Sequence, residues 1–430
     1  MILKINPIQH LKGTVDLPAS KSYSIRAFIV GACGGESQII KPSNCDDALV
    51  AMRVARALGC RIEHKKDKWL LKAFNGSSRV RTISVGESGT VLRLLLPLLS
   101  THTSKAVVTG EGTLVGRPNA HLLQSLRRQG LKINGAGDKE SVPIRYAGGS
   151  IKPGKIAIDG SLSSQFVSAF LITCPSLPKD SLLTITGAKM VSKDYIVMTL
   201  QVLKKAGVHV MPRGKRSFAI RGRQKFKGLK NFIVPSDYGL AAFLMAAGCV
   251  ASSDIRLNGY FNDQFVQADG HILNFLKKMG AKFTRTRQAI RLKGPFKLKG
   301  GVFSLQDCPD LVPIMAVLAL FARGRTILRN IHHARAKESD RISDLRHELL
   351  KVGAKVEEKS GALIIHPLTD PKTGVVLDPH RDHRLAMAFA VLGSRIGVSV
   401  KDMECCRKSY PDFVRDFKAL GASLSVAHKR

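Results

Sequence analysis

The sequence predicts an α/β protein built from six similar units that form two domains, and three regularities of the 430-residue chain support this prediction. A phrase made of helix-like residues, a glycine and strand-like residues recurs about every 70 residues. An apolar run of helix length recurs with the same period, and a β-branched run lies between the two. Self-similarity at a fixed period is typical of repeated structural units.

The glycine of the first phrase follows an amphipathic run each time, as in LRRQGLKI and LKKMGAKF. A glycine directly after a helix adopts the left-handed conformation that lets the chain leave the helix and enter a strand. The six glycines are Gly59, Gly130, Gly207, Gly280, Gly353 and Gly421. Each therefore predicts the end of an amphipathic helix and the start of a strand.

The apolar runs have small polar or acidic starts, which favour helix N-caps, and bodies that are apolar on nearly all sides. We expect these six helices to be buried on most faces and surrounded by sheet, the inverse of the usual α/β layering. The runs start at Ser20, Ser88, Ser163, Ser236, Pro309 and Asp382.

Six units divide into two domains of three, and Pro235 precedes the fourth apolar run. We expect one domain to comprise residues 20–234. The other comprises residues 1–19 and 235–430, because the first strand, ILKINP, has no helix of its own before it and completes a sheet in the C-terminal half. The two crossings between the domains would form a hinge.

The composition is that of a globular protein, with 44% hydrophobic and 23% charged residues and no apolar run long enough to span a membrane. The start of the chain lacks the features of a signal peptide, and we expect a cytoplasmic protein. The formal net charge is +36, which is typical of proteins that bind a polyanionic partner. However, the basic stretches 61–82, 204–229 and 277–299 are dispersed and contain few aromatic residues, so we expect a generally basic surface and no nucleic-acid site.

Residues capable of chemistry gather at the starts of the six apolar helices. Helix N-termini attract anions, with about 0.3–1 kcal/mol for an exposed group, and Lys and Arg add charge-assisted hydrogen bonds. If each domain directs three such ends into one cleft, that cleft suits an anionic substrate. The candidates are Lys21, Ser22, Arg26, Glu87, Ser88, Gly89, Thr90, Arg93, Ser163, Ser164, Gln165, Asp237, Asp307, Asp310, Asp382, His383 and Arg384.

Nine motifs follow one another along the chain: LPASKSYSIRA, ESGTVLR, GRPNAHLL, DGSLSSQF, SKDYI, DCPDLVP, RAKESDRI, DHRLAM and KSYPDF. In type and order they resemble the motifs of the 5-enolpyruvylshikimate-3-phosphate synthase family of enolpyruvyl transferases. The resemblance implies a two-domain inside-out α/β barrel with three βαβαββ units per domain. It also implies a transferase of the shikimate pathway, in aromatic amino acid biosynthesis, that moves the enolpyruvyl group of phosphoenolpyruvate to the 5-hydroxyl of shikimate 3-phosphate and releases phosphate.

The same resemblance implies the site residues. For shikimate 3-phosphate they are Lys21, Ser22, Arg26, Ser163, Ser164, Gln165, Ser192, Tyr195, Asp307, His333 and Lys337. For phosphoenolpyruvate they are Lys21, Gly89, Arg117, Gln165, Arg341, Arg384 and Lys408. Asp307 is expected to take the hydroxyl proton and Glu338 to serve as the acid near the methylene carbon, with Lys21 as the third catalytic residue. We expect no cofactor, no metal and a monomer.

Three residues depart from the family pattern: Glu87 and Ile25 stand where asparagine is usual, and His333 replaces an asparagine on the shikimate side. An alternative function within the fold is UDP-N-acetylglucosamine enolpyruvyl transfer, but the Lys-Asn start and loop cysteine of those enzymes are absent here. Another alternative is a nucleic-acid-binding protein of related fold, such as RNA 3′-phosphate cyclase. The pattern SLPK…YFN…KTG imitates serine β-lactamases, although SLPK follows a helix instead of opening one.

Overall fold

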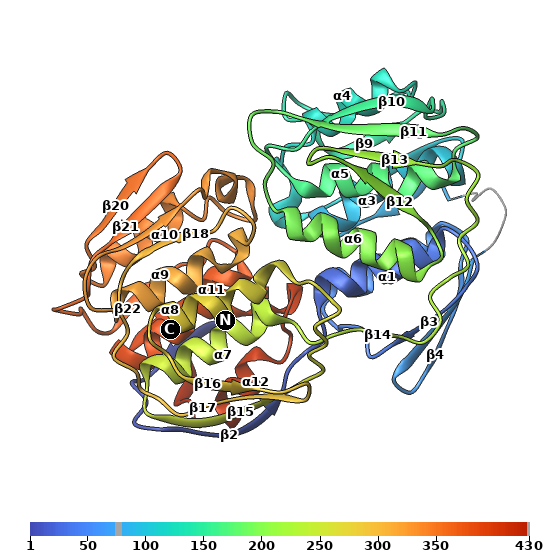
Figure 1. The fold of residues 1–430 in the computed structure, drawn as a ribbon. Coiled ribbons are helices and arrows are strands. Elements are labelled where there is room, and N and C mark those ends of the chain that lie inside the picture. The colour runs from blue at the N-terminus through green and yellow to red at the C-terminus, as the bar shows by residue number, and fades with distance from the viewer. Residues whose placement is uncertain (74–79, 428–430) are drawn as a thin grey trace. The chain divides into compact units, whose positions relative to one another are not determined.

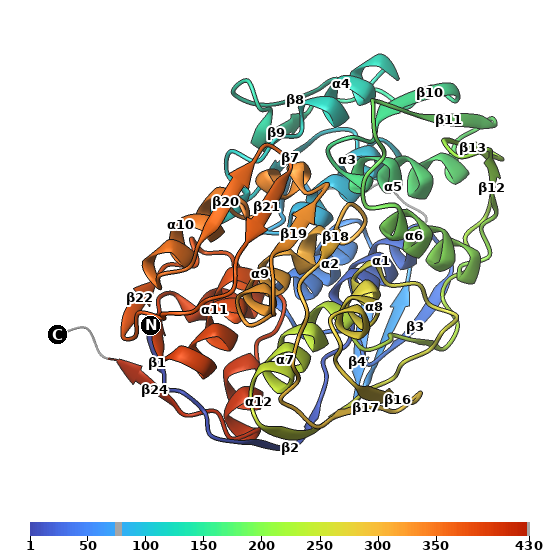
Figure 2. The ribbon, with the colours of Figure 1, turned by 60° about the vertical axis from the view of Figure 1, so that its left-hand side comes forward.

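The computed structural model describes residues 1–73 and 80–427, and the basic stretch 61–82 therefore falls partly outside the described residues. The chain divides into two compact units, one of Met1–Pro18 with Pro235–Arg430 and one of Ala19–Val234. Each unit contains buried helices, amphipathic helices and sheets that cover them, as Figures 1 and 2 show. No helix among the described residues is both long and apolar enough to cross a membrane.

The unit Ala19–Val234 has three buried helices and three amphipathic helices. The buried helices are α1 (Lys21–Ala32), α3 (Gly89–His102) and α5 (Ser164–Thr173). The amphipathic helices are α2 (Asp46–Ala57), α4 (Ala120–Arg128) and α6 (Lys193–Lys205). The strands are β3 (Glu36–Ile40), β4 (Arg61–Lys65), β5 (Lys68–Lys72), β6 (Thr82–Ser84), β7 (Ala106–Thr109), β8 (Ile133–Ala136), β9 (Ser141–Tyr146), β10 (Gly154–Asp159), β11 (Ser181–Thr186), β12 (Val210–Arg213), β13 (Ser217–Ile220) and β14 (Phe232–Ile233).

The other unit repeats this plan. Its buried helices are α7 (Tyr238–Val250), α9 (Val312–Leu320) and α11 (His383–Ile396), and its outer helices are α8 (His271–Lys278), α10 (Ser343–Lys351) and α12 (Phe413–Ala419). The strands are β1 (Ile2–Ile5), β2 (Leu11–Asp16), β15 (Ser253–Asn258), β16 (Phe283–Arg285), β17 (Ala289–Leu292), β18 (Val302–Ser304), β19 (Thr326–Arg329), β20 (Val356–Lys359), β21 (Ala362–Ile365), β22 (Val375–Leu377), β23 (Val398–Val400) and β24 (Leu424–Ala427). The N-terminal strand β1 lies between β23 and β24 and is antiparallel to both.

The described residues form six four-stranded sheets with one shared pattern of strand directions: a parallel pair, then two antiparallel neighbours. The sheets are β14-β3-β5-β4, β6-β7-β9-β8, β10-β11-β13-β12, β2-β15-β17-β16, β18-β19-β21-β20 and β22-β23-β1-β24. Their inner faces cover helices such as α7, of which every residue is buried. An α-helix buried on all sides must be apolar all round, which explains the unpatterned apolar runs.

The six glycines predicted to end the amphipathic helices all have positive φ, from 79° at Gly207 to 107° at Gly130. Four of the six buried helices begin at the expected cap, with Ser20, Ser88, Ser163 and Asp382 accepting a hydrogen bond from a backbone N–H of the first turn. These side chains satisfy donors that a helix start leaves unpaired.

Two helix starts differ from the sequence prediction. Helix α7 is capped by Asp237, because the hydroxyl of Ser236 accepts from the backbone N–H of Tyr260 instead. Helix α9 starts at Val312 without a side-chain cap, after a 3₁₀ turn, η4 (Pro309–Leu311). The carboxylate of Asp310 in that turn contacts arginines rather than the helix end.

Candidate functional site

In the unit Ala19–Val234, the first turn of α1 presents Lys21 from a nearly buried position. Its Nζ lies 3.1 Å from Oδ2 of Asp47, the second residue of α2. The two side chains are only 11% and 6% exposed, so the ion pair is largely shielded from water. Asp47 thus fixes the ammonium group beside the α1 N-terminus.

One turn further along α1, Arg26 joins two helices, α1 and α6, through hydrogen bonds. Its Nε donates to Oγ1 of Thr199 at 2.9 Å, and its Nη2 donates to the carbonyl of Tyr195 at 3.1 Å. Its Nη1 donates to the carbonyl of Ser22 at 2.9 Å. Burial lowers the pKa of Arg26 to about 10, so the guanidinium stays charged at neutral pH. The structure therefore brings Ser22, Arg26 and Tyr195 together, and Ser192 lies at the start of the same helix, α6, with a φ of 56°.

Helix α3 begins at Gly89, and the guanidinium of Arg117 lies against it. A Cβ at position 89 would be 3.0 Å from Nη1 and 3.1 Å from Cζ of Arg117. These distances are shorter than ordinary carbon contacts. The absence of a side chain at this helix start is what allows Arg117, which is 7% exposed, to lie there.

Gln165, in the first turn of α5, is held from α3 at both ends of its amide. Its Oε1 accepts from Nη1 of Arg93 at 2.7 Å, and its Nε2 donates to Oγ1 of Thr90 at 2.8 Å. Ser163 caps the helix and Ser164 is buried in its first turn. The starts of α3 and α5 are therefore locked together by side chains.

Glu87, which stands where the family usually has asparagine, contacts a turn, η1 (Gly112–Leu114). Oε2 of Glu87 accepts from the backbone N–H of Thr113 at 3.0 Å and from its hydroxyl at 2.7 Å. A Cβ at Gly112, where φ is 54°, would overlap with the Glu87 carboxylate. The two hydrogen bonds hold the Glu87 carboxylate against this turn.

In the other unit, Arg341 is surrounded by carboxylates. Its Nε lies 2.7 Å from Asp382, the cap of α11, its Nη1 lies 2.7 Å from Asp310, and its Nη2 lies 2.9 Å from Glu338. Arg341 is 1% exposed, and these carboxylates hold its pKa well above the ordinary value against the opposing effect of burial. Arg341 thus stays positively charged and holds the carboxylates of three acidic residues in place.

Arg384, the second residue of α11, extends this cluster. Its Nη2 lies 3.0 Å from Oδ2 of Asp310 and 3.4 Å from Oδ2 of Asp269, in the turn η3 (Ala268–Gly270). Lys337 lies 3.4 Å from Oδ1 of Asp310. Burial alone would raise the pKa of Asp310, but Arg384, Lys337 and Arg341 hold it well below 3.8.

Lys408, the last residue of the turn η6 (Met403–Lys408), completes the cluster at 3.7 Å from Oε1 of Glu338. Four of the expected residues of this unit, Lys337, Glu338, Arg341 and Arg384, therefore lie together with Lys408. His333 is 2% exposed in the turn η5 (His332–Ala336), and burial lowers its pKa to about 3, which keeps the ring neutral.

Asp307, the expected base, lies half-buried in the segment between β18 and η4. Asp310, three residues later, is the carboxylate that contacts Lys337, Arg341 and Arg384. The sequence predicts Asp310 only as part of a helix start. Asp47 and Asp269 were missed altogether, although both lie at the starts of amphipathic helices, in CDDAL and ADGHI.

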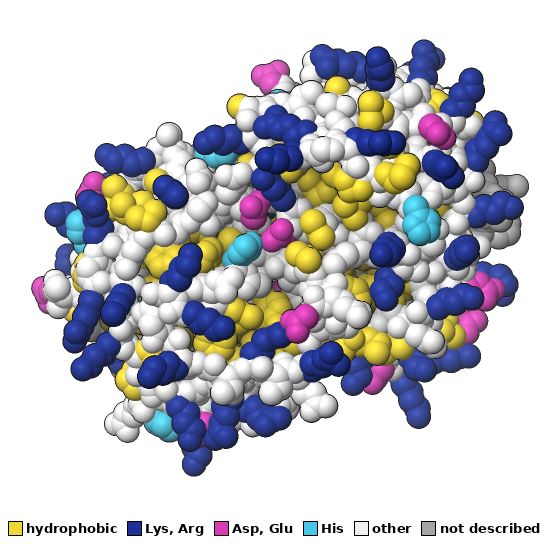
Figure 3. Space-filling model, in the orientation of Figure 1, with side chains coloured by type: hydrophobic (Ala, Val, Ile, Leu, Met, Phe, Trp, Pro, Cys, Tyr) yellow, Lys and Arg dark blue, Asp and Glu magenta, His cyan; other side chains and the backbone are white. Residues whose placement is uncertain are grey.

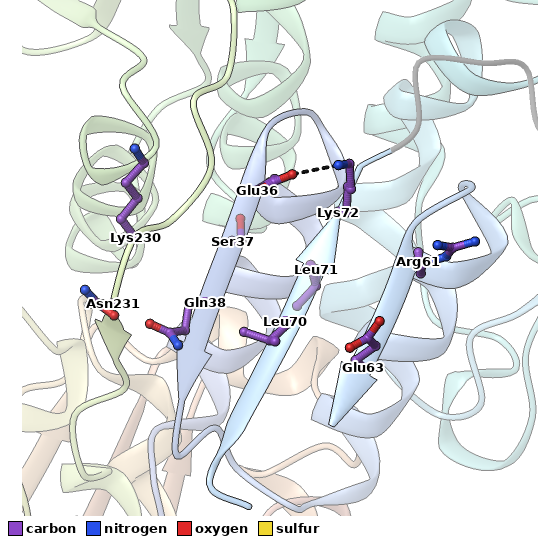
Figure 4. Close-up of a pocket in the computed structure, with 10 residues that line it drawn as sticks. All are labelled: Glu36, Ser37, Gln38, Arg61, Glu63, Leu70, Leu71, Lys72, Lys230 and Asn231. Carbon is purple, nitrogen blue, oxygen red and sulfur yellow. Dashed lines mark ion pairs between the residues drawn. The ribbon is translucent and has the colours of Figure 1, made fainter. Parts of the chain in front are cut away.

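One hollow of the described surface, of about 510 Å³, lies over β3, β4, β5 and the chain before β14. Figure 4 shows this hollow, with Lys72 paired to Glu36 at its rim. Both charged groups are about 70% exposed, and none of the expected site residues lines this hollow. Figure 3 shows Lys and Arg side chains spread over the visible face without a single basic patch.

Comparison with known proteins agrees with the motifs. Residues 5–417 match the family model of EPSP synthase (3-phosphoshikimate 1-carboxyvinyltransferase). The 3-phosphoshikimate 1-carboxyvinyltransferase of Methanococcus aeolicus is 35% identical over 98% of this chain and 99% of its own length. That of Methanocaldococcus jannaschii is 34% identical over 99% of both chains.

Solved structures give the same fold. EPSP synthase from Acinetobacter baumannii superposes with a TM-score of 0.80 at 25% identity and covers 99% of this chain and 100% of its own. The enolpyruvyl transferase NikO from Streptomyces tendae has a TM-score of 0.77 at 19% identity and covers 99% of this chain and 98% of its own. The predicted fold class is confirmed by these similarities. With the match spanning nearly all of its length, the chain belongs to the EPSP synthase family.

Proposed function

We propose that this protein transfers the enolpyruvyl group of phosphoenolpyruvate to the 5-hydroxyl of shikimate 3-phosphate and releases inorganic phosphate. The observation that carries the proposal is the full-length match to the family together with cations at the starts of buried helices. Both substrates carry several negative charges, and helix N-termini with Lys and Arg are suited to bind them. The reaction belongs to aromatic amino acid biosynthesis.

The reaction needs two proton transfers at different atoms. A proton is added to the methylene carbon of phosphoenolpyruvate, the substrate hydroxyl loses its proton as the new C–O bond forms, and the C–O bond to phosphate then breaks as the methyl group returns a proton. We assign the acid near the methylene carbon to Glu338, with Lys21 as a further catalytic group. For the base we keep Asp307, the prediction from sequence. Asp310 contacts Lys337 and Arg384, which lower its pKa and make it a weaker base.

The assignment of substrate groups follows the two clusters. Shikimate 3-phosphate would be bound through Ser22, Arg26, Ser163, Ser164, Gln165, Ser192 and Tyr195, with His333 and Lys337. Phosphoenolpyruvate would be bound through Lys21, Gly89, Arg117, Gln165, Arg341, Arg384 and Lys408. The fixed position of Arg117 beside Gly89 and of Arg341 among its acids supports the second set. A preorganised cation stabilises the departing phosphate without reorganisation.

We further propose that the protein acts as a monomer in the cytoplasm, without nucleic acid. The dispersed basic side chains in Figure 3 support the absence of nucleic-acid binding, because groove binding requires clustered charge.

His333 would contact shikimate 3-phosphate as a neutral ring, which suits a hydrogen bond better than a salt bridge.

The test is phosphate release from phosphoenolpyruvate by the purified protein, with shikimate 3-phosphate and UDP-N-acetylglucosamine offered in parallel. Release with shikimate 3-phosphate alone is expected, together with a product whose mass equals shikimate 3-phosphate plus the enolpyruvyl group. Release only with UDP-N-acetylglucosamine would replace this function by the other transferase activity. Release with neither would refute both.

A further inference from the structure

Asp269 is a buried carboxylate that contacts Arg384, and a glycine beside them leaves room for this contact. It is 6% exposed, and its Oδ2 lies 3.4 Å from Nη2 of Arg384. Gly239, the second residue of α7, provides the room: a Cβ there would overlap Oδ2 of Asp269 and lie 3.0 Å from Nη1 of Arg384. Elements η3, α7 and α11 therefore meet around a single guanidinium.

Cations and carboxylates alternate in the surrounding cluster. Four cations, Arg341, Arg384, Lys337 and Lys408, face the carboxylates of Asp269, Asp310, Asp382 and Glu338. Asp237 is a further acid that acts on Asp269. A phosphate or carboxylate group that binds to Arg384 would give this buried cluster excess negative charge. Burying uncompensated charge is costly, so a carboxylate that can accept a proton would offset the excess.

Asp269 is the carboxylate best placed to do so. It shares Arg384 with Asp310, whose Oδ2 is nearer at 3.0 Å and which also contacts Arg341 and Lys337. Asp310 is therefore held as an anion by three cations, whereas the ion pair of Asp269 with Arg384 is longer, at 3.4 Å.

Other charged groups act on Asp269 from the neighbouring elements. Burial is the largest effect and raises its pKa; Arg384 lowers the pKa, Asp310 and the α7 cap Asp237 raise it, and Lys337 lowers it, which leaves a pKa of about 7. The nearest other titratable groups on the packed helices are engaged elsewhere. Tyr238 accepts from Nε of Arg285, and the ring of His271 stacks on Phe275.

We propose that Asp269 is a proton-linked positioning residue for Arg384: its ionised carboxylate holds the guanidinium, and it takes up one proton from solvent when an anionic group of the substrate binds to Arg384. The proton is carried on a carboxyl oxygen, and the remaining carbonyl oxygen still accepts from the guanidinium. The inference rests on the proposed binding of phosphoenolpyruvate by Arg384.

The first test compares KM for phosphoenolpyruvate between pH 7 and pH 8.5, where a phosphate with a second pKa near 6 is fully ionised. In the wild type KM should rise about tenfold over this range, since a group with a pKa of about 7 loses most of its proton. In Asp269→Asn, which cannot ionise, KM should change less than twofold. The control is Asp254→Asn. This carboxylate on β15, with a side chain 29% exposed, pairs with Arg291 and Lys293 and should keep the wild-type profile. Parallel profiles in wild type and Asp269→Asn would overturn the proposal.

A second test needs no variant. Calorimetric titration of the wild-type protein with phosphoenolpyruvate at pH 8, in two buffers of different protonation enthalpy, gives the number of protons taken up. Half a proton or more is expected, and inorganic sulfate serves as a probe that does not itself titrate. Binding without proton uptake, or no anion binding, would overturn the role of Asp269. Wild-type protein that takes up protons but releases no phosphate with shikimate 3-phosphate would instead refute the proposed function.

Discussion

Replacement of Gly89 by alanine tests how closely Arg117 is fitted to the start of α3. The new Cβ would lie 3.0 Å from Nη1, 3.1 Å from Cζ and 3.3 Å from Nη2 of Arg117. Carbon contacts are optimal at about 3.5–4.0 Å, so the guanidinium must retreat by about 0.5 Å. Because the Arg117 side chain is buried, it has little freedom to restore its contacts from a new position.

The size of the effect follows from the hydrogen bonds at stake. A hydrogen bond to a charged group contributes about 1.5–3 kcal/mol, and losing half of one such bond costs about 1 kcal/mol. This corresponds to about a fivefold rise in KM for phosphoenolpyruvate, with kcat within about twofold. In a helix interior alanine is favoured over glycine by up to about 1 kcal/mol. At this helix start the gain is opposed by the tight contact with Arg117, so the free energy of unfolding should change by less than about 1 kcal/mol.

The assay is the initial rate of phosphate release at varied phosphoenolpyruvate, with thermal unfolding measured in parallel. Glyphosate, which competes with phosphoenolpyruvate in the family this chain resembles, should inhibit the wild type. In Gly89→Ala its inhibition constant should rise more than KM. Gly301→Ala is the matched control, since its Cβ would have an ordinary 3.6 Å contact with Phe303. A KM within twofold of wild type in Gly89→Ala would refute the steric argument.

Four other variants probe the acids of the second unit. Asp307→Asn and Glu338→Gln should each lower kcat by about 100-fold while the protein stays folded, as expected for lost acid–base catalysis, and near wild-type turnover would remove that residue from the mechanism. Asp310→Asn leaves three cations with one carboxylate fewer and should lower the free energy of unfolding in urea by about 3 kcal/mol; an unchanged midpoint would contradict the ion cluster. Asp269 has a raised pKa of about 7, so the folded state binds its proton more tightly than the unfolded state, and wild-type stability relative to Asp269→Asn should fall from pH 4 to pH 7. Equal pH dependence of urea unfolding in both proteins would contradict this.

The repeats were predictable because backbone geometry restricts the residue type. The chain needs a left-handed residue after each amphipathic helix, and glycine supplies it at the lowest cost. The burial of the apolar helices followed from their composition, since a helix such as α7 offers no polar face to water. Both signals are local, which is why the sequence alone carries them.

Helix starts were predictable only where the cap acts within its own turn. At Ser236 the hydroxyl is used by the backbone of Tyr260, 24 residues away, and the cap moves to Asp237. At Asp310 the carboxylate is drawn to Arg341 and Arg384, which are distant in sequence. In both cases a long-range partner competes with the local one.

The missed residues of the site both lie at the start of an amphipathic helix and contact a cation at the start of a buried helix. Asp47 on α2 meets Lys21 on α1, the buried helix of the same repeat. Asp269 before α8 meets Arg384 on α11, the buried helix of another repeat. An acidic residue at a helix start has an ordinary explanation, because it interacts favourably with the positive end of the helix dipole. The sequence therefore offers no reason to assign either aspartate to the site. Only the packing of η3 and α2 beside the cations distinguishes such counter-ions from common helix-start acids, and the same packing makes Asp269 sensitive to any anion that Arg384 binds.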